Sequence, residues 1–361
     1  MTEICSPFST ARAVSTKATW ALLAALGPWA PGPHTAPLVA NVVVESDEGN
    51  NRTLVDSTVA TAPVTIVTPS LPKASVGNQY SAPVDAVGGT GIFSWSIADG
   101  QLPSGVQLGA NGVLNGAPAR TGTYDFLVRA TSDGQIDERW FTIVVGLRFA
   151  DRLWIVRNDC GSPGPNCWSN DPQAAWVDSE GQLHLRIRRK NDVWYSAQVW
   201  TDEVSSHGKH RFYVIGRLDQ LDVNVVGALF LYQDDQHEID IEFARWGDPA
   251  LPNTQYVVQP ANTADNVTAF EMLLAGTFTT HYMDWQPSSI RFKSIYGHHS
   301  EPPSNDLLIN EWLYSGPDVP SESDGLRVHI NLWLKSGLPP SDGQEVEIVI
   351  KSVDLPSRSE G

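Results

Sequence analysis

The stretch Gln236-His-Glu-Ile-Asp-Ile-Glu-Phe-Ala-Arg-Trp-Gly247 is the part of this chain that says most about its fold. Apolar and acidic residues alternate in it, which is the period of a β-strand with one buried face. We expect Ile239, Ile241 and Phe243 to point into a core. The opposite face would carry three carboxylates, those of Glu238, Asp240 and Glu242. Like charges on one face destabilise a strand, so this face calls for a functional explanation.

The surrounding residues, 149–356, have the same strand-like texture. Alternating runs such as Arg327–Trp333 recur between turn residues, and no helical period of ten residues or more is found. The run Val225–Tyr232 is continuously apolar, which predicts a central strand. Nine of the chain's 13 Trp lie here. About 200 residues of strands favour two large stacked sheets or a barrel.

A smaller all-β block precedes this one, over residues 66–145. It is about 80 residues long and has strand patterns separated by Gly- and Pro-rich turns, the size of a small sandwich. We expect Trp95 and Trp140 in its core. Its turn motifs, in order, resemble those of the immunoglobulin-like domain repeated in bacterial surface and secreted proteins: Gly88-Gly-Thr-Gly91, Leu102-Pro-Ser-Gly105, Gly116-Ala-Pro118 and Gly122-Thr-Tyr124. These motifs imply a fold and no activity.

Composition narrows the classes of partner. The chain has 361 residues and a formal net charge of −17, so it would repel nucleic-acid backbones. No apolar run reaches the roughly 18 residues that a membrane helix needs. Residues 27–62 are rich in Pro, Ala and Thr and are interpreted as a leader or linker. The apolar run Trp20–Leu26 resembles an export signal that Gly27-Pro28 cuts short.

The cysteines leave two interpretations open. Cys160 and Cys167 flank a loop rich in Gly and Pro, and Cys5 stands alone. A short disulfide across the loop is expected if the protein is exported, and two free thiols are the alternative.

Three carboxylates in a partly desolvated cleft would have special chemistry. Proximity and burial should raise the pKa of at least one of them, and glycoside hydrolysis needs a protonated carboxyl group beside an ionised one. An acidic solvent face or part of a calcium site are the alternatives. Aromatic side chains that could stack on sugar rings, or else pack in the core, are spread over the block: Trp168, Trp194, Trp200, Trp246 and Trp333.

The larger block resembles glycoside hydrolase family 16, the β-glucanases and their relatives, over nearly all of residues 150–356. The motifs that carry the resemblance follow in the family's order: Gly164-Pro-Asn-Cys-Trp168, Gly181-Gln-Leu-His-Leu185, Glu238-Ile-Asp-Ile-Glu-Phe243, His281-Tyr-Met-Asp-Trp285, Ser289-Ile-Arg291 and Ile330-Asn-Leu-Trp333. The resemblance implies a concanavalin-like jelly roll whose concave face forms the cleft.

The resemblance also implies roles for the carboxylates. Glu238 would be the nucleophile, Glu242 the acid/base, and Asp240 would tune the nucleophile. The spacing without an extra residue before Glu242 is similar to lichenase-type and xyloglucan-active members. Lichenase-type members often have Trp-Asp before the first Glu, where this chain has Gln236-His237. On a flat strand the two glutamates would be roughly 13 Å apart, whereas a retaining pair needs carboxyl groups about 5–5.5 Å apart, so the strand must curve.

Together these observations predict a leader over 1–62, an immunoglobulin-like β-sandwich over 63–147 and a jelly-roll sandwich over 148–361. The expected function is a retaining, endo-acting glycoside hydrolase of β-glucan-type polysaccharides, secreted or at the cell surface and monomeric. A non-catalytic glucan-binding lectin on the same fold and a transglycosylase are the alternatives. No cofactor is expected; a structural calcium ion far from the cleft would suit the family, with Asp354 as one candidate ligand. The expected substrate-binding residues are Trp168, Trp200, Trp246, Asn331 and Trp333.

Overall fold

The computed structural model describes residues 61–356, which fold almost entirely as β-strands. The all-β fold class is confirmed. The helices among these residues are four 3-10 turns of three residues each, η1 (Leu218–Gln220), η2 (Asn305–Leu307), η3 (Glu322–Asp324) and η4 (Lys335–Gly337). None of the described helices has the length and apolar character needed to cross a bilayer. The run Trp20–Leu26 and nearly all of the expected leader lie outside the described residues.

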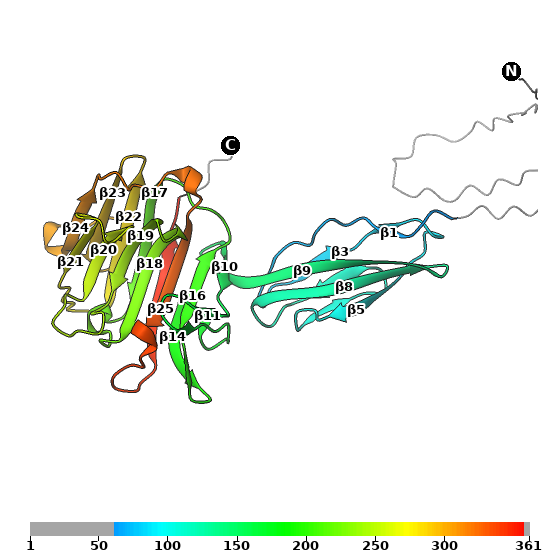
Figure 1. Ribbon diagram of the computed structural model, residues 1–361, viewed down its shortest axis with the longest axis horizontal. Helices are drawn as coiled ribbons and strands as arrows, with labels where there is room; N and C mark the ends of the chain where they lie inside the picture. Colours follow the sequence, from blue (N-terminus) through cyan, green and yellow to red (C-terminus); the bar gives the residue numbers. More distant parts are fainter. Residues whose placement is uncertain (1–60, 357–361) are drawn as a thin grey trace, which may run out of the picture. The chain divides into compact units, whose positions relative to one another are not determined.

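Residues 65–149 supply the strands of the smaller block (Figure 1). The long antiparallel pair β8–β9 is its centre, with β5 on the outer side of β8. The alternating residues Phe126, Val128, Phe141 and Ile143 point into one core. The strands are β1 (Thr65–Ile66), β2 (Ala74–Ser75), β3 (Tyr80–Pro83), β4 (Ala86–Val87), β5 (Ser94–Gly100), β6 (Val106–Leu108), β7 (Val113–Gly116), β8 (Gly122–Ser132) and β9 (Gln135–Phe149).

One residue of this block differs from its expected place. Trp140 was predicted to be in the core, but its side chain is 55% exposed. The reason is the strand period: Phe141 and Ile143 are the buried residues of β9, so Trp140 points to the opposite face. Trp95, on β5, packs against the core as a half-buried side chain.

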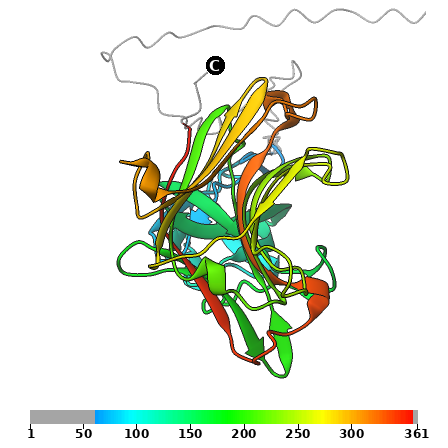
Figure 2. The ribbon, with the colours of Figure 1, turned by 90° about the vertical axis from the view of Figure 1, so that its left-hand side faces the viewer.

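The larger block is made of two antiparallel sheets. One has the order β21-β20-β19-β18-β25-β16-β10 and continues into β9, and the other has the order β13-β14-β26-β17-β22-β23-β24. Figure 2 shows them as two curved layers. The strands are β10 (Arg152–Val156), β11 (Cys160–Gly161), β12 (Asn166–Cys167), β13 (Ala175–Val177), β14 (Leu183–Lys190), β15 (Val193–Tyr195), β16 (Ala197–Thr201), β17 (Gly208–Ile215), β18 (Val225–Asp234), β19 (His237–Phe243), β20 (Thr254–Val258), β21 (Val267–Phe270), β22 (Phe278–Gln286), β23 (Ser289–Tyr296), β24 (Leu308–Tyr314), β25 (Arg327–Leu334) and β26 (Val346–Asp354).

A single apolar core lies between these two sheets. One residue in two along each strand enters it, including Leu229 and Leu231 of β18 and Phe212 and Val214 of β17. Strand β18 pairs with β19 on one side and β25 on the other, which confirms the prediction of a central strand. The alternation therefore leaves the other face of β18, β19 and β25 free to build a site.

Candidate active site

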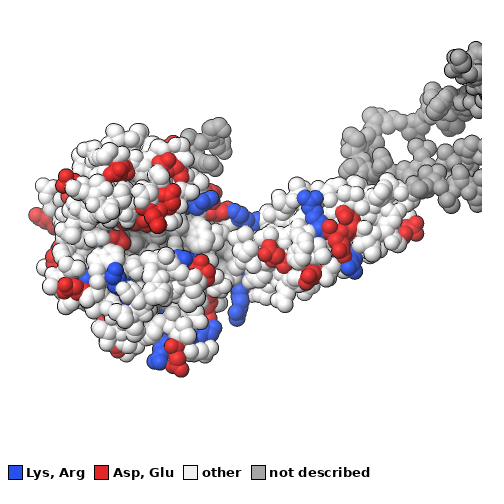
Figure 3. All heavy atoms as spheres, in the orientation of Figure 1, with Lys and Arg blue, Asp and Glu red and all other residues white. Residues whose placement is uncertain are grey.

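Strand β19 presents the three carboxylates as the sequence predicts. Its apolar residues Ile239, Ile241 and Phe243 are at most 1% exposed and belong to the core. The acidic residues therefore share the opposite face, which we call the carboxylate face. Since β19 pairs with β18 and β20 along its length, its backbone is held on both sides. In Figure 3 the larger block is hollowed, and acidic atoms lie in the hollow.

The register of the neighbouring strands defines the surroundings of each carboxylate. Glu238 lies beside Tyr232, Asp240 beside Phe230, and Glu242 beside Ala228. On the next strand Asn331 lies opposite Ala228. Ala228 has the smallest side chain of the three neighbours, so it leaves space between Glu242 and Asn331.

Hydrogen bonds fix part of this group. The amide of Gln255 on β20 donates to Glu242 Oε2 at 2.7 Å, and the carboxyl groups of Glu238 and Asp240 share a hydrogen bond. Asp240 is 3% exposed. Among the described residues, Asp240 Oδ2 and Asn331 Oδ1 are buried oxygens without a hydrogen-bond partner. An unpaired buried polar atom is costly, and both oxygens are therefore available to a ligand.

Burial dominates the protonation of the carboxylate face. It raises the pKa of Glu238 to about 8, with further increases from the charges of Glu242 and Asp235. It raises the pKa of Glu242 to about 7, against the opposing effects of the Gln255 hydrogen bond and the charge of Lys335. Burial and both glutamates also raise the pKa of Asp240 well above its usual range. At neutral pH the group therefore holds protons beside ionised oxygens.

An aromatic cluster lies on the same side of the sheet. Trp333, on β25, is opposite Val226 of β18 and is 7% exposed. Trp246, just after β19, meets Trp333 edge-on with ring centres 6.1 Å apart. The ammonium of Lys335 lies 5.2 Å from the centre of the Trp246 ring. Trp246 is half-buried and has a φ of 55°, a left-handed conformation that few large residues adopt.

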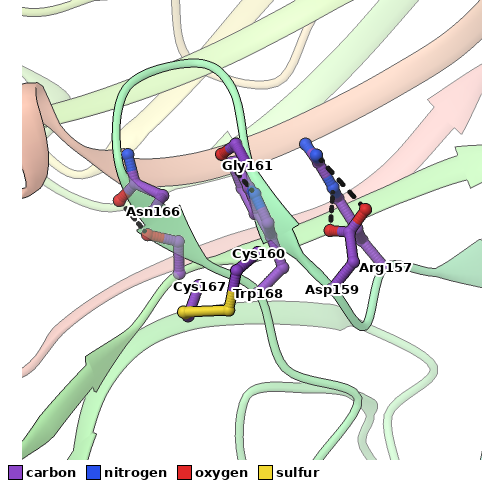
Figure 4. Close-up of a disulfide and its surroundings, with 8 residues drawn as sticks. Arg157, Asp159, Cys160, Gly161, Asn166, Cys167 and Trp168 are labelled. Atoms are coloured by element: carbon purple, nitrogen blue, oxygen red, sulfur yellow. Dashed lines mark hydrogen bonds and ion pairs between the residues drawn. A yellow bond between two sulfur atoms is a disulfide. The ribbon is translucent and has the colours of Figure 1, made fainter.

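Trp168 belongs to this cluster but lies beneath it. It is 2% exposed and packs with Val226, Ala244 and Trp333. The guanidinium of Arg157 covers its ring at 4.4 Å. Its indole N–H donates to the carbonyl of Gly161 at 3.3 Å (Figure 4). An indole covered in this way holds its neighbours in place and offers no open face.

A disulfide closes the loop next to Trp168. Cys160 and Cys167 are bonded, with their Cα atoms 4.0 Å apart, which resolves the two interpretations that the sequence left open (Figure 4). Within the loop, Asn166 is 3% exposed. Its amide donates to the carbonyl of Leu334 at 2.9 Å and its oxygen accepts from the N–H of Leu334 at 3.1 Å. Leu334 lies between Trp333 and Lys335, so the loop fastens the end of β25 where the aromatic cluster is formed.

Several residues of this face were missed by the sequence reasoning. His329 lies between Phe230 and Trp200 in the sheet and stacks on Trp200 at 5.9 Å. Gln198 donates to His329 Nδ1 at 3.1 Å. Burial, with the charges of Arg327 and Arg157, lowers the pKa of His329 to about 3. The signal was present, because His329 is two residues before Asn331 and must share its face.

The structure thus brings seven of the predicted site residues to one face of one sheet: Glu238, Asp240, Glu242, Trp200, Trp246, Asn331 and Trp333. Trp168 lies behind them. For metals, residues 61–356 contain no group of three or more His, Cys, Asp or Glu side chains that could hold an ion. Asp354 accepts a hydrogen bond from the Tyr213 hydroxyl at 2.6 Å instead.

Comparisons with known proteins return the two kinds of protein that the sequence motifs resemble. Residues 62–146 match the family model described as "Putative Ig domain". No curated protein matches the chain by sequence.

Solved structures resemble the larger block. A glycosyl hydrolase family protein from Mycobacterium fortuitum is 18% identical, over 55% of this chain and 90% of that one, with a TM-score of 0.43. A β-1,3-glucanase from Mycobacterium marinum is 18% identical, over 55% and 89%, with a TM-score of 0.41. A β-glucanase from Bacillus licheniformis is 17% identical, over 57% and 92%, with a TM-score of 0.41. At this level of similarity, we argue the function of this chain from its own residues.

Proposed function

We propose that this chain is a secreted, retaining, endo-acting glycoside hydrolase of β-glucan-type polysaccharides. One observation carries the proposal: three desolvated carboxyl groups share protons on one face of a central strand. Retaining hydrolysis requires one ionised and one protonated carboxyl group on the same sugar. The sequence motifs of residues 150–356 support the same chemistry.

In the proposed mechanism, Glu238 attacks the anomeric carbon while Glu242 gives its proton to the leaving oxygen. The glycosidic bond breaks and a glycosyl ester forms on Glu238. Glu242, now ionised, takes a proton from water, and the resulting hydroxide displaces Glu238 with net retention. Asp240 holds a proton that it donates to Glu238, which orients the nucleophile and disperses its negative charge as the ester leaves.

The neighbouring residues have supporting roles. Gln255 orients Glu242 through their 2.7 Å hydrogen bond. The unpaired oxygens of Asp240 and Asn331 would accept hydrogen bonds from sugar hydroxyls. Trp200, Trp246 and Trp333 would contact the apolar faces of sugar rings, and Trp168 would support Trp333 from below. A disulfide and an acidic surface suit an exported protein.

The assignment of the two glutamates can be tested by the products of rescued variants. In Glu242→Ala, an aryl glucoside with an acidic phenol should still form the glycosyl ester, and azide should then release a β-glycosyl azide. In Glu238→Ala, azide should attack directly and give the α-azide. Proton NMR of each product reads the configuration, and an α-azide from the Glu242 variant would reverse the assignment.

The activity itself is tested by reducing-sugar release from a panel of β-glucans, xyloglucan and galactans. Glu238→Gln should lower release more than about a hundredfold without loss of the fold. Glu345→Gln, at an exposed glutamate outside the carboxylate face, is the matched control and should be unchanged. Binding without turnover on every polymer would favour a lectin over an enzyme.

A further inference from the structure

The exposed indole of Trp140 has no role in the proposed active site. It lies in the middle of β9, is 55% exposed, and occurs in a different block from the carboxylate face. Single exposed apolar residues are common on protein surfaces, but a Trp at the centre of a paired strand exposes an unusually large apolar area. Its surroundings therefore bear on whether it serves a ligand.

The cross-strand neighbours of Trp140 form a narrow strip on β8 and β9, which we call the outer strip. Leu127 lies directly opposite Trp140 and is half-buried. On one side, Thr142 donates to Asp125 at 2.5 Å. On the other side, Arg129 and Glu138 form an ion pair at 2.6 Å. The strip thus has one apolar centre with hydrogen-bonding groups at both ends.

These properties select the chemistry of an occupant. The charges of Arg129 and Glu138 neutralise each other, so the strip has no affinity for a strongly charged partner. A stable protein interface needs about 800 Å² from each partner, which one Trp and one Leu cannot supply. A pyranose ring matches the strip better, because its C–H face stacks on an indole and its hydroxyls reach polar groups on either side.

We propose that the outer strip is a second, non-catalytic binding site for the neutral polysaccharide that the chain hydrolyses. This inference rests on the proposed function for the identity of the glycan. One indole gives weak binding, but the strip and the active site belong to one chain. Attachment at either raises the effective concentration of the other on the same polymer, so the strip matters most on large or insoluble substrates.

The test is binding of the full-length chain to insoluble β-glucan particles, measured by depletion in a Glu238→Gln background that leaves the polymer intact. Trp140→Ala should weaken binding about tenfold or more, and Trp140→Phe should retain part of it. Ile136→Ala is the matched control, because Ile136 is 57% exposed on the same strand outside the strip, and it should bind normally. Equal binding by Trp140→Ala and its parent would overturn the proposal.

Two further measurements keep the outcome clear. In the active protein, Trp140→Ala should leave turnover of short soluble oligosaccharides unchanged and lower turnover of the insoluble polymer. Oxidation of Trp140 by N-bromosuccinimide, mapped by mass spectrometry, should slow in the presence of soluble β-glucan and needs no variant. Faster oxidation after removal of residues 1–60, or a dimer that Trp140→Ala dissociates, would assign the strip to another occupant. Absence of turnover in every variant would instead count against the proposed function, since binding is measured without it.

Discussion

Glu242 is held between two opposing influences, the amide of Gln255 and the ammonium of Lys335 on one side and desolvation on the other. Desolvation wins, because a carboxylate without water loses more than one hydrogen bond and one nearby charge restore. Glu238 is in the same situation with two acidic neighbours in place of a cation, so its pKa rises further. The difference between the two glutamates is thus a matter of which charges surround them.

We therefore predict a pH optimum near neutrality. The pKa values of about 8 and about 7 are raised from the ordinary 4.5, so at pH 5 the whole carboxylate face is protonated and lacks a nucleophile. As the pH rises, one carboxyl group ionises and activity appears, and it disappears again when the second loses its proton. The measurement is the pH profile of kcat/KM on a soluble oligosaccharide. A maximum at pH 5 or below would contradict it.

At the scale of single elements, β19 was predictable and the loop beside it was not. The alternation of Glu238 to Phe243 sets both the buried and the exposed face, because a strand has only two. The same rule could have found His329 from its spacing to Asn331. The role of Asn166 could not be found in this way, because its partners Leu334 and Ser196 are brought to it by the fold and by no sequence period.

For this loop we predict that Asn166→Ala raises KM more than it lowers kcat. The substitution leaves the backbone N–H and C=O of Leu334 without partners, at a cost of about 2 kcal/mol or more in the free energy of unfolding. The end of β25 then loosens, and Trp333 and Lys335 lose their fixed positions, while the carboxylates on β19 keep theirs. Steady-state kinetics and urea unfolding measure both effects.

Asn158→Ala is the control for this loop, because Asn158 is exposed and its oxygen makes one long contact, at 3.5 Å, with the N–H of Asn170. It should leave KM unchanged. A dithiol reductant should raise the KM of the parent protein and leave that of a Cys160→Ser/Cys167→Ser variant as it is. An Asn166→Ala protein with the parent KM would show that the loop does not position the aromatic cluster.

At the scale of the whole molecule, the order of two β-blocks could be read from the turn spacing, since Gly- and Pro-rich turns interrupt every short strand. The boundary is harder to place. The sequence predicts it at 147/148, and β9 runs through this position from Gln135 to Phe149. Its residues Ile143 and Val145 belong to one core and Leu147 and Phe149 to the other. A strand that serves two cores has no composition change to mark its midpoint.

We predict that deletion of residues 1–146 leaves a folded, active protein with a lower melting temperature. Leu147 and Phe149 remain and can still pair with β10, and every proposed catalytic residue lies beyond the cut. The removed part of β9 no longer supports that pairing, so unfolding should begin at this edge. Thermal unfolding and turnover of short glucan oligosaccharides are the measurements. A folded truncation without any turnover would mean that the smaller block contributes to the active site.

Acid should also destabilise the fold through a buried histidine. Burial lowers the pKa of His281 from 6.5 to about 3, and its ring nitrogens are paired with Ser294 and Thr279. The unfolded chain binds this proton below about pH 6.5 and the folded chain does not, so its contribution to stability is present above that pH and falls as the pH drops toward 3. The loss is about 1.4 kcal/mol per pH unit.

Because the raised carboxyl groups titrate in the opposite sense, the test is a difference between variants. The free energy of unfolding of the parent should exceed that of His281→Gln at pH 7, and the gap should narrow between pH 6 and pH 4. His237→Gln, at an exposed histidine, should show a gap that does not follow this slope. A constant gap for His281→Gln would contradict the assignment.

The shared strand β9 has a mechanical consequence. Hydrogen bonds in a ladder run across the strand, so tension along β9 loads its bonds to β8 and to β10 in shear, many at a time. A bond set loaded in shear breaks at a much higher force than one that is unzipped from an end. If a moving polymer pulls on Trp140 while the carboxylate face grips another part of it, the force passes through one continuous extended backbone. The weakest link under load would then be the grip on the sugar, and the protein would let go before it unfolds.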